Sequence, residues 1–153
     1  MAGLYGAFVT GSVSIAGGTP QTVIQIVAPT NQRLLIYHVA ISFDGTNSAN
    51  TPGYAKLERQ TGGSFTNTSV APKKINDPSG TGETLQASAK TAVTSEGTEG
   101  DLLWQETIPV FGGLLVMPFG PGQELHVVGG TIFAVKISSA QNVNCYTTIL
   151  YQE

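Results

Sequence analysis

Residues 34–43 read LLIYHVAISF, an apolar run in which β-branched and aromatic side chains recur. Alternate residues form two sets: Leu35, Tyr37, Val39, Ile41 and Phe43 on one side, and Leu34, Ile36, His38, Ala40 and Ser42 on the other. A period of two is typical of a β-strand whose one face meets a core. We therefore expect a strand over 34–43 that leaves the sheet at Phe43.

The same alternation recurs along the chain and decides the fold class. It is clear at 132–137 and 143–151. Shorter strand-like segments lie at 5–15, 22–28, 54–60, 84–94, 102–108, 114–118 and 123–128, with Gly, Pro, Asn or Asp between most of them. Helical periodicity is weak, and the best helix candidate (83–93) also alternates. About ten short strands without a helix predict one all-β domain, a sandwich or a barrel.

The chain divides simply. Residues 1–10 are expected to form an N-terminal arm or a first strand, and residues 11–153 the β-sandwich domain. The stretch 61–83, TGGSFTNTSVAPKKINDPSGTGE, is expected to be irregular. Loops of this length are usually functional rather than idle connectors.

Composition excludes several classes of function. Charged residues make up 11% of the 153 residues, against about 25% in an average soluble protein. A net charge of -3, with Lys73-Lys74 as the only adjacent basic pair, argues against nucleic acid as a partner. No apolar run has the length of a membrane span. A surface so poor in charge is poorly protected against association, so we expect neighbouring molecules to cover part of it.

The N-terminal segment and the cysteine content predict where the chain is made. The first basic residue is Arg33, so the start lacks the charged region of a secretory signal. Cys145 is the single cysteine, which excludes an internal disulfide. We expect synthesis in a reducing cytoplasm.

Chemistry has few candidate residues. Asp44-Gly45 after the first strand is consistent with a calcium loop, a catalytic carboxylate or a plain turn, but Asp44 is the only carboxylate between residues 44 and 52. Zinc needs several close ligands, whereas His38, His126 and Cys145 stand in separate strands. An acid pair for glycoside cleavage has no motif. We predict no catalytic, metal or cofactor residues and interpret Asp44-Gly45 as the exit into an adaptable turn.

Four segments carry a resemblance to a known group of proteins. They read IVAPTNQRLLIYHVAISFDGT (26–46), AKLERQTGGSF (55–65), EGDLLWQETIPVFGG (99–113) and GQELHVVGGTIFAVKISSAQNVNCYTTILYQE (122–153). The residues that carry the motifs are Ala28, Pro29, Asn31, Gln32, Arg33, Phe43, Gly45, Leu57, Arg59, Gln60, Thr61, Gly62, Gly63, Gly129, Gly130, Ile132 and Val135. In these motifs the chain resembles small all-β virion proteins of tailed bacteriophages, over about residues 26–152.

The resemblance implies a capsid decoration, or cement, protein. Such a protein is a jelly-roll-like antiparallel β-sandwich of about eight to ten strands, and it binds the outside of the head as a homotrimer. It stabilises contacts between subunits of its partner, the major capsid protein. The expected location is therefore the capsid exterior, after synthesis in the bacterial cytoplasm, with no nucleic-acid or membrane partner and no cofactor.

Contact residues are predicted in three regions, the uncharged segment 2–8, the 61–83 stretch and the uncharged, adaptable turn 46–52. Leu4, Tyr5 and Phe8 are the expected anchors of an arm, although Tyr5 and Phe8 equally suit the start of a core strand. The full set for capsid or trimer contact is Leu4, Tyr5, Phe8, Asn47, Asn50, Phe65, Lys73 and Lys74.

Two alternatives remain open. One is another virion β-domain, from a head fibre, a tail or a receptor-binding protein. The other is a carbohydrate-binding module or a hydrolase fragment, for which Tyr54, Phe65, Trp104 and Phe111 are the aromatic candidates.

Overall fold

The computed structural model is all-β in the residues it describes, which are 3–9, 12–44, 51–70, 72–75 and 85–153. Within them lie thirteen strands and no helix. The strands are β1 (Leu4–Phe8), β2 (Val13–Ile15), β3 (Gln21–Val27), β4 (Leu34–Phe43), β5 (Gly53–Thr61), β6 (Ser64–Val70), β7 (Lys73–Lys74), β8 (Ser88–Ser95), β9 (Thr98–Ile108), β10 (Leu114–Pro118), β11 (Leu125–Val127), β12 (Ile132–Ser138) and β13 (Val143–Gln152).

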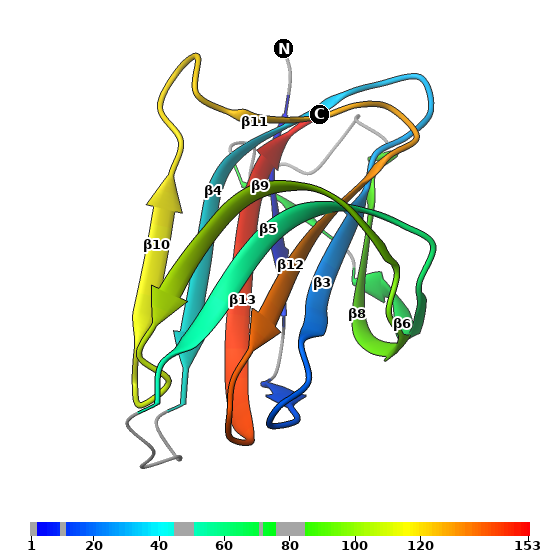
Figure 1. Cartoon of the computed structure of the whole chain (residues 1–153). Helices are drawn as coiled ribbons and strands as arrows, with labels where there is room; N and C mark the ends of the chain where they lie inside the picture. The colour runs from blue at the N-terminus through cyan, green and yellow to red at the C-terminus, as the bar shows by residue number, and fades with distance from the viewer. Residues whose placement is uncertain (1–2, 10–11, 45–50, 71, 76–84) are drawn as a thin grey trace.

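Two antiparallel sheets lie one in front of the other (Figure 1). The first has the order β10-β4-β13-β1-β7, with β11 also paired to β4 and β2 to β13. The second has the order β6-β8-β3-β12-β5-β9. Strands early in the chain therefore pair with strands late in it, as β1 does with β13 and β3 with β12. This wrapping of one chain half around the other is the topology of a jelly roll, which confirms the predicted fold class.

The connection between β5 and β9 contains β6, β7 and β8, which extend both sheets. β6 and β8 add to the second sheet beside β3, and β7 adds to the first sheet beside β1. The prediction of an irregular 61–83 stretch is therefore wrong for Ser64–Val70 and Lys73–Lys74. The chain turns back at Gly62 and Gly63, both at positive φ, and β6 needs no apolar alternation because it forms the edge of its sheet.

The core lies between the sheets and is filled by alternate residues of the long strands. In β13 the buried side chains are the predicted set from Val143 to Tyr151, and in β12 they include Phe133, Val135 and Ile137. Tyr151 stacks on Tyr5 of β1 inside the core. Residues 4–8 are thus the first strand, in the interior of the first sheet, and not an arm.

Strand β4 departs from strict alternation. Its register with β13 shifts, so that Leu150 pairs with His38 and Tyr151 pairs with Ile36. This β-bulge leaves Tyr37 and His38 both partly exposed, and the inward positions change from Leu34 and Ile36 to Val39, Ile41 and Phe43. The alternation in the sequence does not show this shift. The prediction that Leu35 and Tyr37 lie on the same side of the strand as Val39, Ile41 and Phe43 is therefore wrong.

Two of the sequence motifs, the segment that begins at Ala28-Pro29 and the pair Gly129-Gly130, meet in the turns at one end of the sandwich. The N–H of Gly130 donates to the carbonyls of Ala28 and Pro29 at 3.2 and 3.1 Å. At Gly129 a Cβ atom would lie 2.8–3.0 Å from the carbonyl oxygens of Pro29, Thr30 and Gln32. Gly129 is required because the β3–β4 turn passes too close for a side chain. These motif residues have a structural role.

Candidate interaction surface

The outer face of the first sheet presents three rows of side chains across four strands. Each row crosses the strands in the order β10, β4, β13 and β1, and its members are paired residues of neighbouring strands. The first row is Leu114, Ser42 and Tyr146, the second is Val116, Ala40, Thr148 and Phe8, and the third is Pro118, His38, Leu150 and Gly6. We call these residues, together with Ile75 beyond β7, the uncharged face. Leu114 is 66% exposed, and Val116, Tyr146 and Ile75 are each about 45% exposed.

The β1 end of this face is built around Gly6. A Cβ atom at Gly6 would collide with the ring of Phe8 and would lie 2.8 Å from the end of the Ile75 side chain. Phe8 and Ile75 therefore lie across the backbone of β1, and a larger residue at position 6 would displace them. Both remain exposed on their outer sides.

The uncharged face contains no Asp, Glu, Lys or Arg. Charges occur only at its border among the described residues. Lys73 pairs with Gly6 and so continues the third row onto the edge strand β7, and Asp44 at the end of β4 accepts a hydrogen bond from Asn144 at 2.7 Å. An exposed, contiguous and largely apolar patch of this kind marks an interaction site more often than a free surface.

The outer face of the second sheet has the opposite character. Lys136 of β12 is only 7% exposed in its side chain and lies 2.7 Å from Glu99 Oε1 and 3.6 Å from Glu96 Oε2. Glu96 also accepts the backbone N–H and the hydroxyl of Thr22 at 2.8 and 2.6 Å. These bonds hold the β8–β9 turn against the sheet.

Buried amides extend this polar layer. Gln60 donates to Glu58 at 2.7 Å and to Thr22 at 2.9 Å, and it accepts from Gln25 at 2.6 Å. Both Gln60 and Glu58 are almost fully buried. Buried polar groups need partners to offset their lost hydration, so this network fixes the relative positions of β3 and β5.

The charges of this layer shift two pKa values in opposite directions. The Lys136 hydrogen bond and charge lower the pKa of Glu99 below its ordinary value. Burial disfavours the charged form of Lys136, but the hydrogen bond to Glu99 and the nearby carboxylates outweigh it and raise the pKa of Lys136. Lys136 and Glu99 are therefore both charged at neutral pH.

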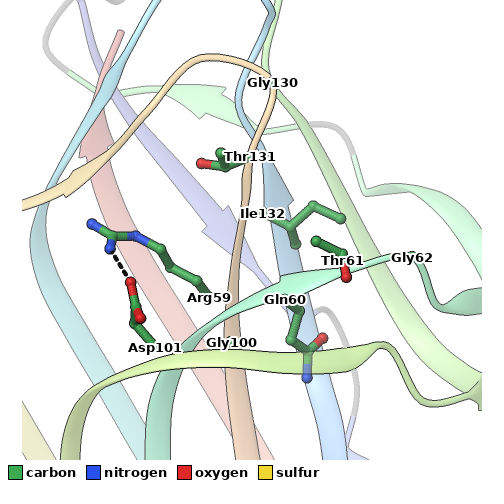
Figure 2. A pocket seen from close by; sticks show the side chains of 9 residues that line it. All are labelled: Arg59, Gln60, Thr61, Gly62, Gly100, Asp101, Gly130, Thr131 and Ile132. Carbon is green, nitrogen blue, oxygen red and sulfur yellow. Dashed lines mark hydrogen bonds and ion pairs between the residues drawn. The ribbon is translucent and has the colours of Figure 1, made fainter.

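A hollow of about 370 Å³ lies at one end of the second sheet (Figure 2). It is lined by Arg59, Gln60, Thr61, Gly62, Gly100, Asp101, Gly130, Thr131 and Ile132. Arg59 donates to the carboxylate of Asp101 at 2.6 Å and to the carbonyl of His126 at 3.4 Å. Six of the lining residues belong to the sequence motifs, which are brought together here from β5 and the start of β12.

The predicted contact residues fall into three groups. Tyr5 and Phe65 are buried, so their side chains pack inside the subunit. Leu4 is partly buried, whereas Phe8 and Lys73 are exposed and Lys74 pairs with Tyr5 across strands β7 and β1. Asn47 and Asn50 lie outside the described residues.

Sequence reasoning missed most of the uncharged face. Leu114, Val116 and Tyr146 were placed in strands without a role, although each stands opposite the core-facing set of its strand. The absence of charge on the outward positions of four separate strands was the available signal.

The residues considered above as zinc ligands, His38, His126 and Cys145, lie on three different strands, β4, β11 and β13. Cys145 is buried, and burial raises the pKa of its thiol to about 12. Within the described ranges, no three His, Cys, Asp or Glu side chains gather as a metal site. No helix there is long and apolar enough to cross a membrane.

Trp104 is 44% exposed and meets Phe119 edge-on, closing the side of the sandwich between β9 and β10.

Comparison with protein-family models, with curated proteins and with solved structures finds no match to this chain.

Proposed function

We propose that this chain is a virion structural protein, a capsid decoration protein that binds the outside of a phage head as a homotrimer. In this role it stabilises contacts between major capsid subunits. The observation that supports the proposal most is the uncharged, exposed face of the first sheet, because the charges of the second sheet are instead paired with one another, as in Lys136 and Glu99. The proposal also agrees with the resemblance of the sequence motifs to phage virion proteins.

A decoration protein needs contact area and rigidity, and it needs no reactive group. Apolar surface contributes about 25 cal/mol per Å² when it is removed from water. A trimer multiplies this gain, because several contacts must be released together before a subunit leaves. The jelly roll supports the role since its two sheets leave two broad faces and several edges free for neighbours.

Binding to heads tests the function. Purified protein is mixed with heads that lack it, the heads are sedimented, and their retention of DNA is followed on heating. We expect saturable binding and release of DNA at a higher temperature than from bare heads. Protein that stays in the supernatant at every concentration would contradict the proposal.

The predicted capsid contact at Lys73 gives a matched pair of variants. We expect Lys73→Glu to weaken binding to heads, because Lys73 is exposed at the border of the uncharged face. Lys90→Glu makes the same charge change on β8 of the other sheet and serves as the control. Equal binding by both variants and the unaltered protein would remove Lys73 from the contact.

The hollow beside Arg59 favours a second candidate, a receptor-binding virion domain. Guanidinium, carboxylate, hydroxyl and backbone groups around 370 Å³ suit the hydroxyls of a sugar. Asp101→Ala would then abolish binding on a glycan array without loss of head binding. No glycan signal from the unaltered protein would exclude this candidate.

A further inference from the structure

We propose that the free edge of β9 accepts an extended, basic segment of a partner protein as an added strand of the second sheet. β9 is the last strand of that sheet, beside β5 (Figure 1). It is eleven residues long, and its residues from Thr98 to Thr107 are exposed or partly exposed. Backbone groups of a strand alternate between its two edges, so about half of those in β9 face away from β5. Within the described residues, no backbone group of a turn or of another strand binds them there.

The other three end strands of the two sheets are protected against pairing, whereas part of β9 is not. β7 has only two residues, both of them lysine, and β10 has five residues and ends in Pro118. The register of β6 shifts twice within its seven residues. Short length, Lys, Pro and bulges are the usual protection of a sheet edge. β9 also has two register shifts, but its Trp104–Ile108 part pairs with Gly53–Leu57 in unbroken register, and this regular part is the proposed site.

The charge of β9 favours a basic occupant. The strand carries Glu99, Asp101 and Glu106 and no Lys or Arg. The cations that bind the first two are less exposed than the carboxylates. The side chain of Lys136 is 7% exposed against 48% for Glu99, and that of Arg59 is 35% exposed against 73% for Asp101. The edge therefore presents negative charge to a neighbouring molecule.

A second copy of this chain is disfavoured as the occupant. Two β9 strands that paired with each other would place carboxylates, and no Lys or Arg, on the adjoining strands. Like charges on paired strands are destabilising. The occupant is therefore an extended segment of a different protein that carries Lys or Arg.

The spacing of side chains along β9 specifies this segment further. Trp104 and Glu106 pair with Leu57 and Ala55, which face the core, so both side chains lie on the same side of the sheet. Trp104 is 44% exposed, and the carboxylate of Glu106 accepts the N–H of Thr107 at 3.2 Å. An added strand would place an apolar side chain beside Trp104 and, two residues away, a basic one beside Glu106. Its backbone carbonyls would bind the outward N–H groups of β9.

Fluorescence anisotropy with three labelled peptides tests this inference. The basic peptide is Lys-Thr-Val-Thr-Lys-Thr-Val, which places Lys and Val two residues apart on one side of a strand. The acidic peptide has Glu in place of Lys. The methylated peptide keeps the basic sequence but carries N-methyl groups on its backbone amides, which removes the donors that strand pairing needs. We expect saturable binding of the basic peptide and at least about tenfold weaker binding of the other two.

Two variants of the protein locate the contact. Glu106→Lys should weaken binding of the basic peptide at least about tenfold, because an attraction becomes a repulsion. Glu124→Lys makes the same charge change in the connection between β10 and β11 and should leave the affinity within about twofold. In amide NMR spectra of the unaltered protein, the basic peptide should shift the signals of Gln105 and Thr107 most.

Three results would overturn the inference: no saturable binding of the basic peptide, equal binding of the methylated peptide, or NMR shifts confined to other strands. The test is separate from that of the proposed function and goes beyond it. Peptide binding at β9 without binding to heads supports the inference while the decoration role falls. Head binding without peptide binding leaves the decoration role standing and contradicts the inference.

Discussion

Replacement of Lys136 by Met gives the sharpest test of how the second sheet is held together. Met keeps most of the volume of the lysine stem but removes the ammonium group. Glu99 and Glu96 would then lose a cation at 2.7 and 3.6 Å, and the buried carboxylate of Glu58 would lose a nearby positive charge. Glu99 would keep only the more distant Lys56, at 3.9 Å, and Glu96 only its two hydrogen bonds from Thr22.

The magnitude follows from the burial of each partner. Removing one partner of a fully buried ion pair costs about 3–5 kcal/mol. Lys136 meets that condition at 7% exposure, but Glu99 is 48% exposed and Glu96 31%, so water screens part of the loss. We therefore expect the free energy of unfolding to fall by about 2 kcal/mol, and the melting temperature by roughly 4–8 °C for a domain of this size.

Urea unfolding followed by circular dichroism measures the change, at one fixed protein concentration because the proposed assembly would add to apparent stability. Lys90→Met on β8 is the control, since it removes a lysine from the same sheet and lies outside the Lys136 cluster. The m-value, which is the slope of the unfolding free energy against urea concentration, should be unchanged. A loss below about 0.5 kcal/mol, or an equal loss in the control, would refute the view that Lys136 locks the β8–β9 turn.

Three further predictions concern the turns and the titrating groups. Gly113→Ala should lower the melting temperature well beyond Gly120→Ala, because a Cβ at residue 113 would collide with a backbone carbonyl oxygen of its own turn whereas at residue 120 the nearest atom is 3.7 Å away; equal melts would contradict this. Because folding lowers the pKa of Glu99, this carboxylate stabilises the fold above its unfolded pKa near 4.5, and the stabilisation is lost as pH falls through the folded pKa; Lys136→Met should remove this step from an acid titration of the unfolding free energy. Because folding raises the pKa of Lys136, the stabilisation from this lysine is complete below about pH 10.5 and is lost as pH rises through the folded pKa. The Cys145 thiol, with its pKa raised to about 12, should react with iodoacetamide only after unfolding, and rapid labelling of the native protein would show that the core at β13 opens.

The sequence predicted the long central strands well because their burial is one-sided. Strand β4 begins and ends where the alternation does, at Leu34 and Phe43, and β13 buries every second residue as expected. The bulge at Tyr37 and His38 could not be predicted, because it depends on the register with β13, a strand more than a hundred residues away. Alternation records which face is buried and carries no information about the partner strand.

The polar strands and the candidate surface were harder to predict for related reasons. β6 is an edge strand with one neighbour, so its sequence carries little of the apolar alternation used to find strands. The rows of the uncharged face join Leu114, Val116 and Tyr146 only through pairing across strands. The low content of charge predicts that neighbours cover some surface, but it does not say which strands bring uncharged residues together.

Cryo-electron microscopy of the phage particle that carries this protein tests the proposed decoration role. We expect density for this jelly roll on the outside of the head, in trimers between major capsid subunits. Heads without such density, or a few copies confined to a tail or a fibre, would contradict it.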